Sequence, residues 1–275
     1  MEQFCIGFIG AGAMAEALIS GIIEAKLCKP CNIWVTNKSN VERLQNLCAR
    51  WGVNAATGKR EVLERASILV VAVKPKDVGP VLGEIAPLLE GLERKLVISV
   101  AAGIPIRTFE NALPEGTAVV RAMPNTSCRV LESATAVARG NYVTNAHMAA
   151  TERLFSCVGK VVEVQESMLD AVTGLSGSGP AYVYLLAEAL IEAGLHLGLP
   201  HDITSTLALQ TLYGAAKMLK ETGQHPEVLR RQVTSPNGTT IAGLKALEEA
   251  GFTKALINAV QQATARSREM TQQFA

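Results

Sequence analysis

The sequence has almost no net charge, and this shortage excludes a class of partners. Its 275 residues contain 26 lysines and arginines against 25 aspartates and glutamates, a formal net charge of +1. Such a chain has no bulk electrostatic field that would gather nucleic acid or anionic lipid. The sequence therefore predicts no nucleic-acid partner and no membrane partner.

Long hydrophobic runs are also missing. One of the longest, ILVVAV at residues 68–73, is far shorter than the roughly 18 residues of a membrane span. Residues 1–4 lead directly into an apolar segment, without the basic region of a secretory signal or an Arg-rich presequence. We therefore expect a cytoplasmic protein.

Histidine is scarce and cysteine is scattered. The four histidines and six cysteines show no metal-ligand spacing, so the sequence predicts no metal site. Cys28 and Cys31 form a single CxxC pair, which has no second pair and no nearby histidine. Reduced thiols without a function are the favoured interpretation, and a redox pair is the alternative.

The first half alternates short β-rich runs with segments of helical length, among them residues 14–25 and 40–50. The strands are expected at residues 5–9, 32–36, 68–73, 96–100 and 118–121, with weaker ones at 135–138 and 161–164. Strands separated by helices predict parallel βαβ crossovers and a sheet covered on both faces. The predicted fold class of the first half is α/β, with a parallel-rich sheet.

The second half changes character after about residue 166. Strand patterns end, and Ala/Leu-rich helices are expected at residues 181–197, 203–222, 241–250 and 253–270. A Gly-rich segment at 174–180 suits a kink or a helix restart. The helices carry more apolar positions than one buried stripe needs, which indicates burial by another subunit. We predict an α/β domain at 1–166 and an all-α domain at 167–275.

A glycine-rich loop follows the first predicted strand. Gly10, Gly12 and Ala15 form G-x-G-x-x-A between a strand and a helix, the context of a dinucleotide site. Gly10 permits the tight turn, Gly12 lets the backbone approach a pyrophosphate, and Ala15 allows close packing. The helix N-terminus adds free N–H groups and positive potential.

The end of the second predicted strand reads Thr36, Asn37 and Lys38, where an NAD-preferring site usually places Asp or Glu. An amide and a lysine leave room and counter-charge for a 2′-phosphate, so NADP(H) is favoured, with NAD(H) as the alternative. The alternative is that Lys38 is a solvent-exposed charged residue at the start of the next helix. Residues 72–75, after the third strand, are expected to flank the cofactor.

The chain has no motif for nucleophilic, metal or P-loop chemistry. Reduction of a protonated C=N bond depends more on how the enzyme orients the substrate than on an acid/base residue. Such a reaction is therefore compatible with the lack of these motifs. The cluster at residues 233–240 offers hydroxyls and free N–H groups at a helix start, a site suited to a carboxylate. Ordinary capping of that helix is the alternative.

Together these motifs resemble the pyrroline-5-carboxylate reductase family over nearly the whole chain. The resemblance rests on six segments in the family's order: residues 8–15, 72–75, 99–103, 121–126, 173–182 and 233–240. It implies NAD(P)H-dependent reduction of the C=N bond of 1-pyrroline-5-carboxylate to L-proline, the last step of proline biosynthesis. It also implies that residues 1–166 form an NADP(H)-binding Rossmann domain and that residues 167–275 form an all-α dimerisation and substrate domain. The helical domains of two chains would intertwine in a homodimer, with further assembly into a homodecamer, a pentamer of dimers.

The same resemblance assigns the site residues. The cofactor-binding residues would be Ile9, Gly10, Ala11, Gly12, Ala13, Met14, Asn37, Lys38, Ala72, Val73, Lys74, Pro75, Val100, Ala101 and Ala102. The substrate carboxylate would be held by Ser235, Gly238, Thr239 and Thr240, with the catalytic Thr240 hydroxyl near the imine nitrogen. Met123, Pro124 and Asn125 would flank nicotinamide and substrate, and Glu166 matches an acidic position near the substrate pocket.

Two residues depart from the family pattern. Asn237 stands where the family usually has glycine, and asparagine tolerates a positive φ. Lys59 stands roughly where an asparagine commonly touches the adenosine. Two rival functions also remain: a β-hydroxyacid dehydrogenase, for which Lys217 would be the catalytic lysine, and a non-catalytic NADP(H)-sensing protein.

Overall fold

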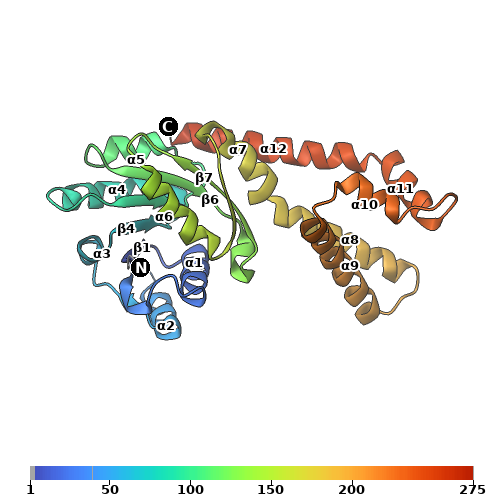
Figure 1. The fold of residues 1–275 in the computed structure, drawn as a ribbon, viewed down its shortest axis with the longest axis horizontal. Helices are drawn as coiled ribbons and strands as arrows, with labels where there is room; N and C mark the ends of the chain where they lie inside the picture. The colour runs from blue at the N-terminus through green and yellow to red at the C-terminus, as the bar shows by residue number, and fades with distance from the viewer. Residues whose placement is uncertain (1–3, 39, 275) are drawn as a thin grey trace. The chain divides into compact units, whose positions relative to one another are not determined.

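The computed structural model describes residues 4–38 and 40–274 (Figure 1). In these residues eight strands form one sheet in the order β3-β2-β1-β4-β5-β6-β7-β8. The strands are β1 (Ile6–Ile9), β2 (Ile33–Thr36), β3 (Asn54–Ala55), β4 (Ile68–Val71), β5 (Leu96–Ser99), β6 (Ala118–Met123), β7 (Ser133–Arg139) and β8 (Gly159–Glu163). Neighbouring strands are parallel except for β6 and β7, which are antiparallel.

Helices cover both faces of this sheet. They are α1 (Ala13–Glu24), α2 (Val41–Trp51), α3 (Lys59–Arg65), α4 (Pro75–Leu89), α5 (Ile106–Ala112) and α6 (Asn145–Ser156). One apolar cluster joins Phe8 and Val70 to α1, α2 and α6. A second joins Leu69 and Val71 to α3, α4 and α5. Because successive strand residues point to opposite faces, this two-sided burial explains the continuous apolar run of β4.

The remaining helices are α7 (Leu169–Val172), α8 (Gly179–His196), α9 (His201–Thr222), α10 (Pro226–Gln232), α11 (Thr239–Glu249) and α12 (Phe252–Gln273). The predicted α/β class, with a parallel-rich sheet and a helical second half, is confirmed. The two-residue strand β3 carries no periodic signal, and the sequence does not predict it.

The chain divides into two compact units. The first comprises the described residues up to Ser178 together with those from Gln261 onward, and the second comprises residues 179–260. The domain boundary predicted between residues 166 and 167 separates a cofactor-binding part from a dimerisation part. It is a functional division, which compactness does not test, and it stays a prediction.

The last part of α12 belongs to the first unit because it is tied back to it by hydrogen bonds. Asp170 Oδ1 accepts bonds from Ser267 Oγ at 2.6 Å and from Thr271 Oγ1 at 3.0 Å. The Thr108 hydroxyl donates to the Phe274 carbonyl at 2.9 Å, next to α5 (Figure 1).

The Gly-rich segment is a π-helix from Thr173 to Gly177, in which Ser178 N–H donates to the Thr173 carbonyl at 2.8 Å. Helix α8 begins just after it with Pro180 in its first turn. Proline is tolerated there because a first-turn N–H has no partner within the helix. This interruption agrees with the predicted kink or restart.

Candidate active site

Five loops of the first unit meet at one edge of the sheet. They follow the carboxyl ends of the mutually parallel strands β1, β2, β4, β5 and β6. Open α/β sheets bind ligands at this edge, in the crevice where the strand order reverses. Here the reversal lies between β1 and β4, so the loop after β1 lies at the crevice.

The glycine loop after β1 is held tightly by its neighbours. Gly10 N–H donates to the Thr36 carbonyl at 2.9 Å, and Ala72 N–H donates to the Ile9 carbonyl at 2.9 Å. Gly10 has φ +106°, and a Cβ there would lie 2.5 Å from the Ala72 oxygen. Only glycine fits this turn, as the loop motif requires. These contacts place the loops after β1, β2 and β4 side by side.

Gly12 and the start of α1 fit a bound pyrophosphate. A Cβ on Gly12 would meet nothing closer than 3.9 Å, so the backbone is open to a ligand. Among the described residues, no side chain caps the N-terminus of α1. Its first N–H groups and the positive end of the helix dipole therefore remain available to phosphate oxygens. These observations match the requirements of a dinucleotide cofactor.

Arg43 is a component of this loop that the sequence analysis missed. From α2, its Nε donates to the Ala11 carbonyl at 2.5 Å, and its Nη2 contacts Glu16 at 3.0 Å. The first bond ties the loop carbonyl to α2, and the second ties α2 to α1. The residues are 32 and 27 positions apart in the chain, and no local pattern links them.

At the end of β2, Asn37 Nδ2 donates to the Asn40 carbonyl at 3.0 Å. The Lys38 side chain is 81% exposed, and its ammonium lies 3.6 Å from the Glu84 carboxylate. Lys59 forms an ion pair with the same carboxylate. The structure therefore brings Lys38 and Lys59 to one acidic residue.

The end of β6 brings Met123, Pro124 and Asn125 to the same edge. Asn125 is buried; its Nδ2 donates to the Ser176 carbonyl at 2.9 Å, and its Oδ1 accepts from Ser127 N–H at 3.1 Å. The Asn125 side chain therefore anchors the π-helix. The Met123 side chain lies against Gly177, where an added Cβ would come within 2.7 Å of the methionine methyl.

Glu166, which follows β8, is engaged with the protein. Its Oε1 accepts from Ile106 N–H, at the start of α5, at 2.7 Å and lies 3.3 Å from an Arg121 nitrogen. The Arg121 side chain is 5% exposed. Glu166 therefore compensates a buried charge, a contribution that sequence reasoning did not anticipate.

The predicted carboxylate cluster forms a turn that leads into α11 in the second unit. Gly238 N–H donates to the Ser235 carbonyl at 3.0 Å, and a Cβ on Gly238 would collide with Ser235 Oγ. Asn237 adopts φ +56°, which asparagine tolerates. In this described turn no side chain caps α11, so simple N-capping does not account for the hydroxyls. Thr239 is exposed and Thr240 half-buried.

The described residues contain no group of three or more His, Cys, Asp or Glu side chains that could hold a metal ion. All six cysteines are free thiols. Burial raises the pKa of the Cys28 thiol to about 11. This direction is opposite to that of a reactive thiol.

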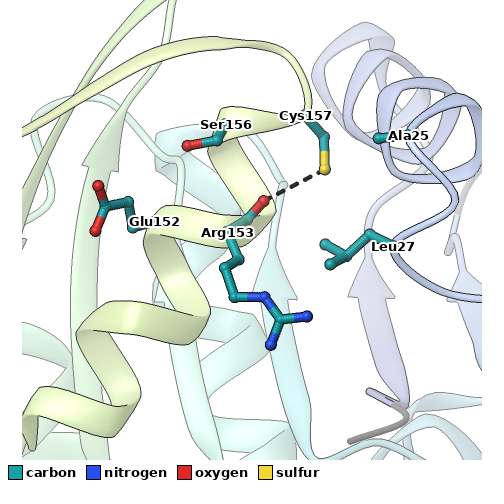
Figure 2. Close-up of a pocket in the computed structure, with 6 residues that line it drawn as sticks. All are labelled: Ala25, Leu27, Glu152, Arg153, Ser156 and Cys157. Carbon is teal, nitrogen blue, oxygen red and sulfur yellow. Dashed lines mark hydrogen bonds between the residues drawn. The ribbon is translucent and has the colours of Figure 1, made fainter. Parts of the chain in front are cut away.

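A depression of about 370 Å³ lies between the end of α1 and α6 (Figure 2). Helix α1 runs antiparallel to β1, so its end lies toward the amino ends of the parallel strands. The depression is therefore away from the cofactor edge. Its lining residues are Ala25, Leu27, Glu152, Arg153, Ser156 and Cys157.

Within the described ranges, no helix is both long and apolar enough to cross a membrane. The parallel sheet, the reversal of strand order between β1 and β4 and the uncapped glycine loop are typical of a dinucleotide-dependent oxidoreductase. Residues 5–103 match the family model described as NADP oxidoreductase coenzyme F420-dependent. Residues 166–270 match the model described as pyrroline-5-carboxylate reductase dimerisation.

Individual relatives agree with this class. The chain is 45% identical to pyrroline-5-carboxylate reductase of Methanosarcina acetivorans, over 98% of this chain and 99% of that protein. It is 43% identical to pyrroline-5-carboxylate reductase 1 of Bacillus subtilis, over 98% and 91%. The solved reductase of Coxiella burnetii superposes with a TM-score of 0.92 at 36% identity, covering 98% of this chain and 99% of that one. The NADP-bound Plasmodium falciparum enzyme gives a TM-score of 0.86 at 34% identity, with coverage of 98% and 99%.

The chain belongs to the pyrroline-5-carboxylate reductase family. The family predicted from the six segments is thereby confirmed. The comparisons concern whole chains, so the roles of individual residues stay predictions.

Proposed function

We propose that the protein reduces the C=N bond of 1-pyrroline-5-carboxylate to L-proline with NAD(P)H, the last step of proline biosynthesis. Membership of the family carries this proposal. The geometry of the glycine loop supports it, because Gly10, Gly12 and the uncapped α1 suit a dinucleotide. The bound cofactor supplies the hydride, and the chain binds and orients the two reactants.

The cofactor would lie along the edge formed by the loops after β1, β2, β4 and β5. Ile9–Met14 would receive the pyrophosphate, and Asn37 and Lys38 the 2′-phosphate of NADP(H). Ala72–Pro75 and Val100–Ala102 would flank the dinucleotide. The backbone bonds between these loops support the assignment, because Ala72 and Val100 N–H groups bond to the Ile9 and Val71 carbonyls.

The substrate carboxylate would be held by Ser235, Gly238, Thr239 and Thr240. The available N–H groups at the start of α11 and the neighbouring hydroxyls would stabilise a negative charge. The Thr240 hydroxyl would lie near the imine nitrogen and act as the catalytic group. Met123, Pro124 and Asn125 would border the nicotinamide, and Glu166 would line the substrate pocket.

We also assign the protein a homodimeric state, with a pentamer of dimers as the complete assembly. Helices α8, α10 and α11 have no buried residue among those described, and α9 buries only Thr204 and Ala208. Large apolar side chains are correspondingly exposed, including Leu185, Leu207 and Tyr213. Exposure on this scale is typical of a surface that a partner covers. Light scattering coupled to size exclusion should give a multiple of the 29.2 kDa chain mass.

A cytoplasmic location completes the proposal. Fractionation of the source cells should recover the activity with cytosolic markers. Recovery with membranes would contradict it.

The decisive experiment is NADPH oxidation by the purified protein in the presence of the cyclic imine. L-proline should form in equal amount, and NADH should also be tested. A protein that binds NADPH without any turnover would instead be a cofactor sensor.

Thr240→Val tests the substrate site. Loss of the hydroxyl should raise KM and lower kcat for the imine by about tenfold or more, because one charge-assisted hydrogen bond contributes roughly 1.5–3 kcal/mol. The Kd for NADPH should be unchanged. Thr206→Val is the matched control, since the Thr206 hydroxyl bonds to the Asp202 carbonyl of its own helix. Equal kinetics in both variants would remove Thr240 from the site.

A further inference from the structure

Glu84 is an acidic residue on α4 that connects two lysines from separate parts of the chain. Its Oε2 pairs with Lys59, the first residue of α3, and its Oε1 lies 3.6 Å from Lys38 Nζ. The Lys59 side chain is only 14% exposed, whereas Lys38 is 81% exposed. Two ammonium groups therefore share one carboxylate.

This cluster lies on the adenosine side of the cofactor edge. Lys38 follows the carboxyl end of β2, which pairs with β1 and its glycine loop. Lys59 opens α3, after the carboxyl end of the parallel strand β3. In this kind of fold the ribose nearest the adenine lies at the end of the second strand. Both cations therefore lie where a 2′-phosphate would enter.

We propose that Glu84 sets the preference between NADPH and NADH by competing with the 2′-phosphate for Lys38 and Lys59. This inference rests on the proposed function. Lys59 is thereby a second cation of the 2′-phosphate subsite. Glu84 lies outside the cofactor loops and acts as a specificity-determining residue.

The charges explain why the competition acts on one cofactor more than the other. The two lysines carry two positive charges, and the hydrogen bond and charge of Lys59, followed by the charge of Lys38, hold the pKa of Glu84 below its usual range. The carboxylate is therefore ionised at neutral pH. A 2′-phosphate adds nearly two negative charges beside it and must draw an ammonium away from Glu84. A ribose with a free 2′-hydroxyl needs no such exchange, so Glu84 weakens NADPH binding selectively.

The test is calorimetric titration with adenosine 2′,5′-bisphosphate and with 5′-AMP, two probes that differ only in the 2′-phosphate. In Glu84→Gln, the Kd for the bisphosphate should fall about three- to tenfold, while that for 5′-AMP stays constant. In Lys59→Met, the bisphosphate should bind about tenfold more weakly, again without a change for 5′-AMP. Both effects should shrink as salt rises, because the cluster is partly exposed.

Matched controls lie on the neighbouring helix. Arg60 and Glu64 form an exposed pair on α3 at 3.8 Å, so Arg60→Met and Glu64→Gln make the same charge changes outside the cluster. They should leave the ratio of the two Kd values within about twofold of wild type. NADPH and NADH kinetics should follow the binding data, with the NADPH preference rising in Glu84→Gln.

Three outcomes would overturn the inference while leaving the proposed function standing, provided that wild type still reduces the imine with NADPH. The first is an equal change in Kd for the bisphosphate and for 5′-AMP. The second is a higher Kd for the bisphosphate in Glu84→Gln. The third is a change in the ratio of the two Kd values in the control variants as large as that in the Glu84 and Lys59 variants. Thermal melts of each variant identify a loss through misfolding. If wild type bound neither probe and did not oxidise NADPH, the proposed function itself would fail.

Discussion

Removing the Glu166 carboxylate should destabilise the first unit, because this group compensates a buried cation. Its Oε1 accepts from Ile106 N–H at 2.7 Å and lies 3.3 Å from Arg121, whose side chain is 5% exposed. A hydrogen bond to a charged group contributes about 1.5–3 kcal/mol, and breaking a buried pair costs about 3–5 kcal/mol. Glu166 is itself 34% exposed, so solvent reduces the second figure. We expect Glu166→Ala to lose about 2–4 kcal/mol and Glu166→Gln, which retains an acceptor, about half of that.

The assay is thermal unfolding at one fixed protein concentration, since oligomers melt in a concentration-dependent way. At about 2–4 °C per kcal/mol for a chain of this size, a loss of about 2–4 kcal/mol should make Glu166→Ala melt roughly 4–16 °C below wild type. Glu163→Ala is the control, because the Glu163–Arg139 pair is exposed and should contribute no more than about 1 kcal/mol. An unchanged melting temperature together with a KM for the imine raised about tenfold would refute the reasoning. Glu166 would then contact the substrate, as the family resemblance implies, and not act chiefly as an anchor.

The loop geometry leads to two further predictions, and the burial of a thiol leads to a third. Gly10→Ala should lower both the melting temperature and NADPH affinity, because φ is +106° and the new Cβ meets the Ala72 oxygen. Gly12→Ala should weaken NADPH binding about tenfold or more without changing the melting temperature, since the new Cβ would occupy only the space open to the ligand. An equal fall in melting temperature in both variants would contradict this. Because the folded pKa of Cys28 is about 11 against an ordinary value of 9, its contribution to stability is complete below pH 9 and is lost as pH rises toward 11. The free energy of unfolding should therefore fall by up to about 2 kcal/mol over this range, and by less in Cys28→Ala. Cys31→Ala should reduce this fall only slightly, because the charge of the exposed Cys31 is the smallest of the causes that raise the Cys28 pKa.

Much of the first unit could be predicted from local pattern. Strands β1, β2, β4 and β5 are apolar runs with a sharp end, and the structure begins and ends them within two residues of the predicted ranges. The conformation of the glycine loop could also be predicted from its residues, because few residues other than glycine adopt the positive φ of Gly10. Strand β3 was missed, since two residues cannot display a period.

The site was predictable only where each residue belongs to a motif. Gly10, Gly12 and Lys38 follow strands that can be recognised by themselves. Arg43 and Glu84 have no such signal, because their partners lie 32 and 46 positions away along the chain. Glu166 was singled out by resemblance, but its bonds to Arg121 and Ile106 depend on how β6 and α5 are placed.

The sequence alone therefore determined the α/β class, the cofactor loop and the family, because these depend on periodicity, glycine conformation and residues close together in the chain. Only the tertiary structure decided which charges meet: Glu84 with Lys38 and Lys59, Arg43 with the loop carbonyl, and Glu166 with Arg121. Side-chain pairing across the fold is set by strand order and helix packing, and distances along the chain do not contain that information.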